Sequence, residues 1–187
     1  MELNDKKFAV LVDADNISHR KIKDILDEIA NYGTPTIKRI YGDFTNPKFA
    51  AWKEVLLENS ITPIQQYAYT TGKNATDSAL IIDAMDILYS GNVDGFCIVT
   101  SDSDFTKLVL RLRESGMTVI GMGERKTPNA FVSACETFKF LDILLNDENP
   151  SQNPSLPQTR KESEADGSRK EAEKESGGMT TKFILSR

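Results

Sequence analysis

Two apolar runs in this chain each stop abruptly at carboxylates. Residues 8–12 are apolar and lead into Asp13, and residues 96–99 are apolar and lead into Asp102 and Asp104. A continuous apolar run rich in β-branched residues predicts a strand that is buried on both faces of a parallel sheet. Open α/β sheets build their ligand sites at the carboxyl ends of such strands. The pattern therefore predicts an acidic site at one edge of a parallel sheet.

Strand and helix signals alternate along residues 7–146. We expect strands over 7–12, 36–41, 61–67, 95–100 and 117–122, and helices over 18–32, from 47 onward, over 77–89 and 103–115, and near 129–135. Residues 138–145 fit a last strand or a helix, and the pattern does not decide between them. Such alternation predicts βαβ units with right-handed crossovers. The expected fold class is α/β, a three-layer α/β/α domain with a mostly parallel sheet.

The composition changes after Asp147. Residues 148–178 consist mainly of Asn, Pro, Ser, Gln, Lys, Glu and Gly. A segment with so few apolar side chains predicts a disordered linker that follows a folded domain of residues 1–147. Residues 179–187 regain Phe183, Ile184 and Leu185, so they fit either the start of an incomplete C-terminal element or a terminus with incidental apolar residues.

The charge balance limits the class of function. The net charge of −5 lies in residues 1–147, which hold 16 Lys and Arg against 21 Asp and Glu. Nucleic-acid binders usually show a basic footprint, but a metal-dependent nuclease has an acidic site until its cation binds. One His and two separated Cys do not make a zinc site of the usual kind. No signal peptide or apolar span of membrane length is recognisable, so we expect a soluble, cytoplasmic protein.

Four aspartates form the candidate site. Asp13, Asp102 and Asp104 follow expected strands, and Asp77 opens the helix over 77–89. The strands 7–12 and 95–100 can be neighbours where the winding of the sheet reverses, which would bring the four acids together. Asp77, Asp102 and Asp104 taken singly are each better explained as a helix cap or a first-turn residue. Together they repel one another, and a hard divalent cation with oxygen ligands would compensate that repulsion.

Weaker candidates surround these four. Asp43 follows the strand over 36–41, and Asp83 lies inside the apolar helix, where it could reach the site or pair with a Lys or a hydroxyl group. Lys73, Arg125 and Lys126 belong to loops expected at the carboxyl edge of the sheet. We expect these three basic side chains to contact phosphates of a substrate.

Three stretches of the chain resemble a known family. Residues 8–16, 72–88 and 95–108 resemble the NYN domain of the LabA/DUF88 type, a branch of the PIN-like nucleases. The matching motifs are Asp13-x-x-Asn16, Gly72-Lys73-x-x-x-Asp77 with Asp83 following, and Ser101-Asp102-Ser103-Asp104-Phe105. The resemblance covers about residues 7–145 and implies a PIN-like fold with strand order 3-2-1-4-5. It also implies that residues 179–187 could begin a winged-helix module of the OST-HTH/LOTUS type.

The resemblance implies RNA cleavage or processing with Mg²⁺ or Mn²⁺. The metal ligands would be Asp13, Asp77, Asp102 and Asp104, with Asn16 as a further catalytic residue. We expect single-stranded RNA as substrate, because an acidic domain has little to hold a duplex by its backbone. The residues expected to bind the substrate are Lys73, Arg125, Lys126 and Ser101. A homo-oligomer is compatible with this chain.

Two other functions fit the same residues. Asp13-Ala14-Asp15 also fits the first motif of haloacid-dehalogenase-like phosphatases, in which the first Asp is a nucleophile and the second a general acid. The domain could instead be a non-catalytic RNA-binding or assembly module, because a fold does not settle activity. Cleavage of RNA, turnover of a phosphomonoester and binding without turnover distinguish the three.

Overall fold

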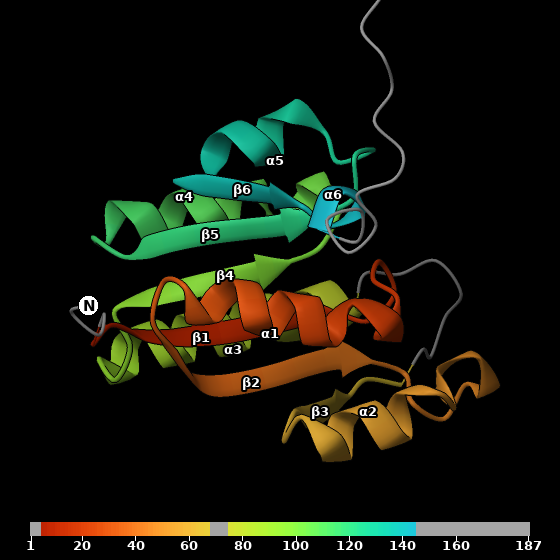
Figure 1. The fold of residues 1–187 in the computed structure, drawn as a ribbon. Coiled ribbons are helices and arrows are strands. Elements are labelled where there is room, and N and C mark those ends of the chain that lie inside the picture. Colours follow the sequence, from red (N-terminus) through yellow and green to blue (C-terminus); the bar gives the residue numbers. More distant parts are fainter. Residues whose placement is uncertain (1–4, 68–74, 145–187) are drawn as a thin grey trace, which may run out of the picture. The chain divides into compact units, whose positions relative to one another are not determined.

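The computed structural model describes residues 5–67 and 75–144 of the 187-residue chain. These residues form a six-stranded parallel sheet with the order β3-β2-β1-β4-β5-β6 (Figure 1). The α/β class, the three-layer architecture and the strand order 3-2-1-4-5 predicted from the sequence are confirmed. The sixth strand extends the sheet beside β5.

The elements follow the predicted alternation. The strands are β1 Lys7–Asp13, β2 Thr34–Gly42, β3 Thr62–Gln65, β4 Gly95–Val99, β5 Thr118–Gly123 and β6 Thr137–Phe140. The α-helices are α1 Ile22–Ala30, α2 Trp52–Glu58, α3 Ala75–Ser90, α4 Thr106–Glu114, α5 Asn129–Ala134 and α6 Leu141–Leu144. Three short 3₁₀ helices precede α1, α2 and α4, namely η1 His19–Lys21, η2 Pro47–Phe49 and η3 Ser103–Phe105.

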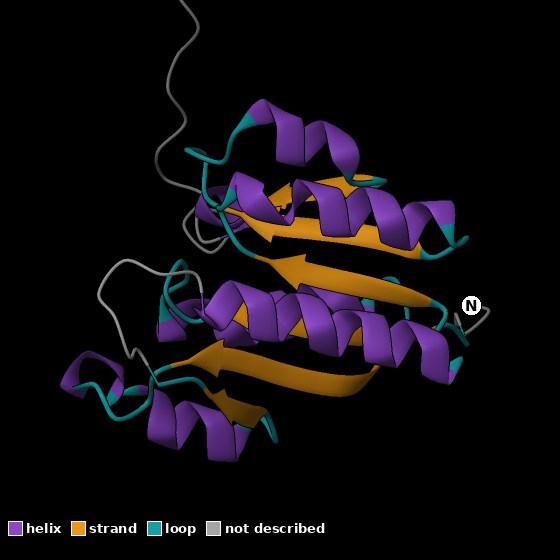
Figure 2. Ribbon diagram, turned by 180° about the vertical axis from the view of Figure 1, so that it is seen from behind, coloured by secondary structure: helices purple, strands orange, loops and turns teal. Residues whose placement is uncertain are grey.

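Both faces of the sheet are covered, as the continuous apolar strands require. Val10 and Val12 of β1 pack into one core with the buried side chains of α1 and α2. Ala9 and Leu11 point to the other core, which α3, α4 and α5 complete. Figure 1 shows α1 in front of the sheet, and Figure 2 shows the helices of the opposite face from behind. Successive side chains of a strand alternate between faces, so one strand serves both cores.

Short elements mark where the sequence was least informative. The ambiguous segment over 138–145 contains both alternatives, because β6 ends at Phe140 and α6 begins at Leu141. Each of these two elements has only four residues, which is too short for its periodicity to be read.

The predicted linker over 148–178 and the C-terminal stretch over 179–187 lie outside the described residues. Within the described ranges, no helix is long and apolar enough to cross a membrane.

The register of the sheet sets the position of the site. Asp13 lies opposite Tyr41 of β2, and Val12 lies opposite Val99 of β4. Thr100, the residue after β4, therefore comes level with Asp13. At the outer edge, β3 is short and contains Pro63. The carboxyl ends of β1 and β4 are thus side by side, as predicted for a switch point of the winding.

Candidate metal centre

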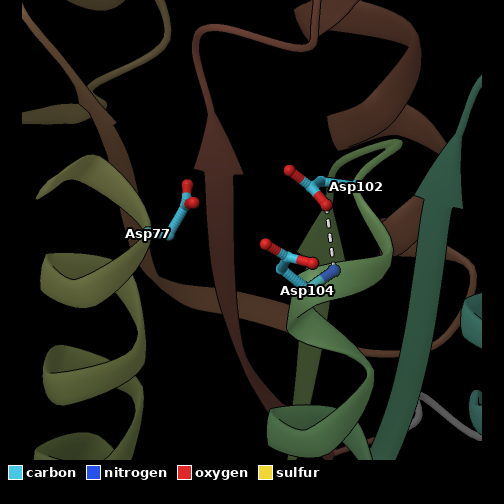
Figure 3. Close-up of side chains that lie close together, drawn as sticks. All are labelled: Asp77, Asp102 and Asp104. Carbon is cyan, nitrogen blue, oxygen red and sulfur yellow. Dashed lines mark hydrogen bonds between the residues drawn. The ribbon is translucent and has the colours of Figure 1, made fainter. Parts of the chain in front are cut away.

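Three of the four predicted aspartates form a group at the carboxyl edge of the sheet. Asp77, Asp102 and Asp104 each offer one carboxylate oxygen, and these atoms lie within 4.8 Å of one another. Asp77 comes from the first turn of α3, whereas Asp102 and Asp104 come from the start of η3. Figure 3 shows Asp77 facing the other two across the end of the sheet. The sequence prediction that these residues converge agrees with this geometry.

Asp102 is both a helix cap and a member of the group. It is the N-cap of η3, and its Oδ1 accepts a hydrogen bond of 2.9 Å from the backbone N–H of Asp104, drawn as the dashed line in Figure 3. The cap fixes the turn that carries both acids. Asp102 can therefore cap the helix and also belong to the acidic group, because a carboxylate has a second oxygen.

Asp13 lies beside this group, is 1% exposed, and is heavily hydrogen-bonded. Its Oδ1 accepts a hydrogen bond of 3.0 Å from the backbone N–H of Asp15. Its Oδ2 accepts hydrogen bonds of 2.6 Å from Asn16 Nδ2 and 3.0 Å from Thr100 Oγ1. The group of Asp77, Asp102 and Asp104 does not include Asp13. Asn16, predicted beside the metal, thus directly fixes the carboxylate of Asp13.

Burial and neighbouring carboxylates raise the pKa of Asp77 in this group and of Asp13 beside it. Burial, followed by the charges of Asp13, Asp102, Asp104 and Asp15, raises the pKa of Asp77 to about 6. Burial also raises the pKa of Asp13, while its hydrogen bonds from Asn16 and Thr100 act in the opposite direction. Carboxylates that crowd in this way favour either a proton or a cation. The donor set, oxygen atoms of several carboxylates, suits a hard divalent cation.

Thr100 is a residue of the site that the sequence reasoning missed. Its hydroxyl group donates to Asp13 and accepts a hydrogen bond of 3.1 Å from the backbone N–H of Asp102. A Cβ atom at Gly123 would lie 2.4 Å from the carbonyl oxygen of Thr100, so only glycine allows the end of β5 to come this close. The one available signal was a hydroxyl residue at the end of an apolar run, and its complete burial is seen only in the structure.

The two secondary acids lie outside the group. Asp83 accepts hydrogen bonds from the Tyr41 hydroxyl and from Arg39 Nη1. Asp43 accepts a hydrogen bond of 2.7 Å from Gln65 Nε2. Of the two options left open for Asp83, the structure shows pairing, with an arginine and a tyrosine hydroxyl.

Three of the predicted substrate-binding residues, Ser101, Arg125 and Lys126, follow the strands β4 and β5. The hydroxyl group of Ser101 accepts a hydrogen bond of 2.9 Å from the backbone N–H of Glu124. Lys126 is exposed and pairs with Glu124 at 3.0 Å, and Arg125 is also exposed. Lys73 lies outside the described residues. The sequence reasoning did not consider Lys48, whose Nζ lies 2.6 Å from Asp15 Oδ1.

The fold and the group of acids define a class of protein, a PIN-like α/β/α domain with an acidic site at the end of its central strands. The model of the NYN domain family matches residues 7–144, and the chain belongs to this family. The NYN domain belongs to the PIN-like nucleases, so membership of this family indicates a nuclease class. The narrower LabA/DUF88 assignment stays a prediction.

Two known proteins are similar to this chain. An uncharacterised protein of Methanocaldococcus jannaschii is 26% identical over 121 residues, which are 63% of this chain and 47% of that protein. The chain therefore matches about half the length of this relative. A crystal structure of a protein of unknown function from Vibrio parahaemolyticus has a TM-score of 0.63 at 19% identity, and the match covers 77% of this chain and 98% of that one. This second likeness supports the fold.

Proposed function

We propose that this protein is a metal-dependent ribonuclease that hydrolyses phosphodiester bonds of single-stranded RNA. The observation that carries the proposal is the group of Asp77, Asp102 and Asp104, whose carboxylate oxygens lie within 4.8 Å of one another. Membership of the NYN family adds the reaction class. The raised pKa of Asp77 supports the same conclusion, because it reports negative charge that a bound cation would neutralise.

The residues present fit Mg²⁺ or Mn²⁺. Asp77, Asp102 and Asp104 would hold the cation directly. A carboxylate has about four lone-pair positions, so the three hydrogen bonds to Asp13 leave Oδ1 able to accept one more partner. We therefore retain Asp13 as a ligand. The bound cation would activate a water molecule and stabilise charge on the leaving oxygen.

Asn16 acts through Asp13 in this proposal. Its side-chain amide donates to Asp13 Oδ2, which holds the buried carboxylate in one orientation. Thr100, the residue that follows the neighbouring strand β4, donates to the same oxygen. These two donors favour the ionised form of Asp13 and partly offset the rise in its pKa that burial causes.

The substrate would be held by the loops around the acids. Arg125 and Lys126 follow β5, so they belong to a loop at the carboxyl edge of the sheet. Lys73, the third basic residue of this proposal, lies outside the described residues. Ser101 would act indirectly, since its hydroxyl group anchors the backbone of the loop that carries Arg125 and Lys126. A domain with excess negative charge has few groups to hold a duplex backbone, which favours a single strand.

The test is cleavage of a fluorescently labelled, unstructured RNA by the wild type and two variants. Asp102→Asn removes a ligand, whereas Asp86→Asn changes an exposed acid of α3 outside the group and serves as the control. We expect cleavage that needs Mg²⁺ or Mn²⁺, stops with EDTA, falls about 100-fold or more in Asp102→Asn and is unchanged in Asp86→Asn.

Other outcomes would assign another function. A wild type that binds the RNA without cleaving it, with unchanged affinity in Asp102→Asn, would support a binding module. Turnover of a small phosphomonoester with phosphate trapped on Asp13 would support the phosphatase. The carboxylate of Asp13 is buried and therefore poorly accessible as a nucleophile, so we do not expect the phosphatase result.

A further inference from the structure

Helix α3 carries a second aspartate in an unexpected place. Leu80, Ala84 and Ile87 are the buried residues of α3 that face the sheet, and their spacing defines an apolar stripe. Asp83 lies on the border of this stripe, and its side chain is 20% exposed. An acid that is held at such a position by hydrogen bonds is often no more stabilising than an apolar residue of similar volume. Packing alone therefore does not explain an aspartate at position 83.

Asp83 connects α3 to β2 through two hydrogen bonds. Its carboxylate accepts from the hydroxyl group of Tyr41 and from Nη1 of Arg39. Tyr41 is completely buried, and the Asp83 and Arg39 side chains are 20% and 33% exposed. We call these three residues the β2–α3 clamp. Hydrogen bonds are directional, whereas apolar contacts tolerate sliding, so the clamp fixes the rotation and register of α3 against the sheet.

The clamp and the acidic group lie on opposite borders of the same helix. Asp77 and Asp83 are six residues apart, which is a rise of about 9 Å and a separation of roughly 120° around the helix axis. Asp83 therefore points toward β2, while Asp77 points toward Asp102 of η3. Tyr41 is also the strand residue opposite Asp13. The clamp thus ties the helix that carries Asp77 to the strand that adjoins Asp13.

We propose that the β2–α3 clamp is a positioning device that sets the distance of the Asp77 carboxylate from Asp102 and Asp104. Its function as a metal-site support rests on the proposed ribonuclease activity. A rotation of α3 by about 20° would move a side-chain tip on a radius of 5–6 Å by roughly 2 Å. Mg²⁺ demands ligand distances of about 2.0–2.1 Å, so a shift of this size would remove Asp77 from the coordination sphere.

The first test compares metal-free crystal structures of the wild type and Tyr41→Phe in the same crystal form. This substitution removes one hydroxyl group and keeps the ring in the core. We expect the Asp77 carboxylate to move away from Asp102 and Asp104 by about 1 Å or more, a displacement large enough to affect catalysis. Arg39→Gln removes the other donor and provides a second variant. Unmoved Asp77 in both variants would overturn the proposal.

The second test measures the Mn²⁺ dissociation constant well below the melting temperature. We expect it to rise roughly 10-fold in Tyr41→Phe, with kcat falling and KM unchanged. Tyr89→Phe is the matched control, because Tyr89 accepts a hydrogen bond from Arg111 at the far end of α3. Ile87→Val destabilises the same helix without touching the clamp. An equal loss of affinity in Ile87→Val would show a merely structural role and overturn the proposal.

These tests separate failure of the clamp from failure of the ribonuclease. A wild type that binds no Mn²⁺ contradicts the proposed function, while the metal-free crystal structures still decide whether the clamp positions Asp77. A wild type that binds Mn²⁺ as tightly as Tyr41→Phe, with Asp77 in the same place, contradicts only the clamp.

Discussion

Helix α3 holds two aspartates whose surroundings are opposite. Asp83 is stabilised by a guanidinium group and a tyrosine hydroxyl from β2. Asp77, six residues earlier, faces other carboxylates, and its pKa is raised to about 6. A carboxylate with partners from the protein stabilises the fold, whereas a carboxylate among like charges destabilises it until a proton or a cation binds. The comparison separates an acid that serves the structure from an acid available for chemistry.

The largest expected difference concerns activity. Asp77→Asn should lower metal-dependent RNA cleavage by about 100-fold or more, because it removes a ligand and leaves the fold intact. Its free energy of unfolding without metal should equal or exceed that of the wild type, since one repelling charge is lost. Cleavage assays and urea unfolding measure the two effects. A variant that cleaves normally would remove the distinction between the two aspartates.

Asp83→Asn should show the opposite balance. It weakens the pairing with Arg39 in a partly buried site, so the free energy of unfolding should fall by about 1–3 kcal/mol, less than the loss for a fully buried pair. Urea unfolding gives the value, with the exposed acid Asp86→Asn as the control. A loss no larger than in the control would show that Asp83 is not a structural acid.

Metal binding should raise the melting temperature of the wild type. A cation at 100 times its dissociation constant stabilises the folded state by about 2.7 kcal/mol, which is roughly 5–10 °C for a domain of this size. Asp77→Asn should lose most of this gain and Asp86→Asn none of it. Differential scanning fluorimetry with millimolar Mn²⁺ measures the shifts, and equal shifts in all three proteins would contradict the assignment of the ligands.

Asp77 is a better choice than Asp13 for these experiments. Both oxygens of Asp13 accept hydrogen bonds from protein donors. The amide group of an Asp13→Asn variant would face one of these donors, leaving a buried polar group unsatisfied at a cost of about 1–3 kcal/mol. Loss of metal binding in that variant would therefore be confused with loss of stability.

The pH dependence of stability should report Asp77 as well. Its pKa in the folded protein is about 6, above the ordinary value of 3.8, so the folded state binds the proton more tightly than the unfolded state does. The metal-free protein should therefore lose stability as the pH rises from about 4 through 6. The loss should be smaller in Asp77→Asn. Unfolding midpoints across this pH range give the difference, and identical profiles would show that Asp77 titrates normally.

The smallest effect belongs to an exposed acid. Asp15 pairs with Lys48, and their side chains are 43% and 54% exposed. Lys48→Gln should change the free energy of unfolding by less than about 1 kcal/mol, because water screens surface pairs. A larger loss in urea unfolding would mean that exposure of Asp15 does not make its ion pair weak, and that Asp15 contributes as much to stability as Asp83 does.

The sequence predicted the acidic site because its signals are local. Asp13, Asp102 and Asp104 stand directly after apolar strands, and a parallel sheet brings such strand ends to one edge. Asp77 opens a helix with a strong apolar pattern. The strand order followed from the resemblance to the NYN domain and is confirmed. These features need no knowledge of which side chains meet across the fold.

The remaining contacts depend on register, which a single sequence does not encode. Tyr41 and Arg39 meet Asp83 because β2 and α3 pack at one particular rotation, 42 and 44 residues apart in the chain. The hydrogen bond between Thr100 and Asp13 depends on the pairing of β1 with β4. The ambiguity over 138–145 had another cause, since both elements there are too short to show a period.

Pro63 in the outer strand β3 has a consequence for self-association. An edge strand offers unpaired backbone groups to another chain, and a second copy could extend the sheet there. Proline lacks the N–H donor that such an extension needs, and β3 has only four residues. We therefore expect that addition of a strand from another copy is disfavoured at β3, and that any homo-oligomer of this protein would be built from other surfaces.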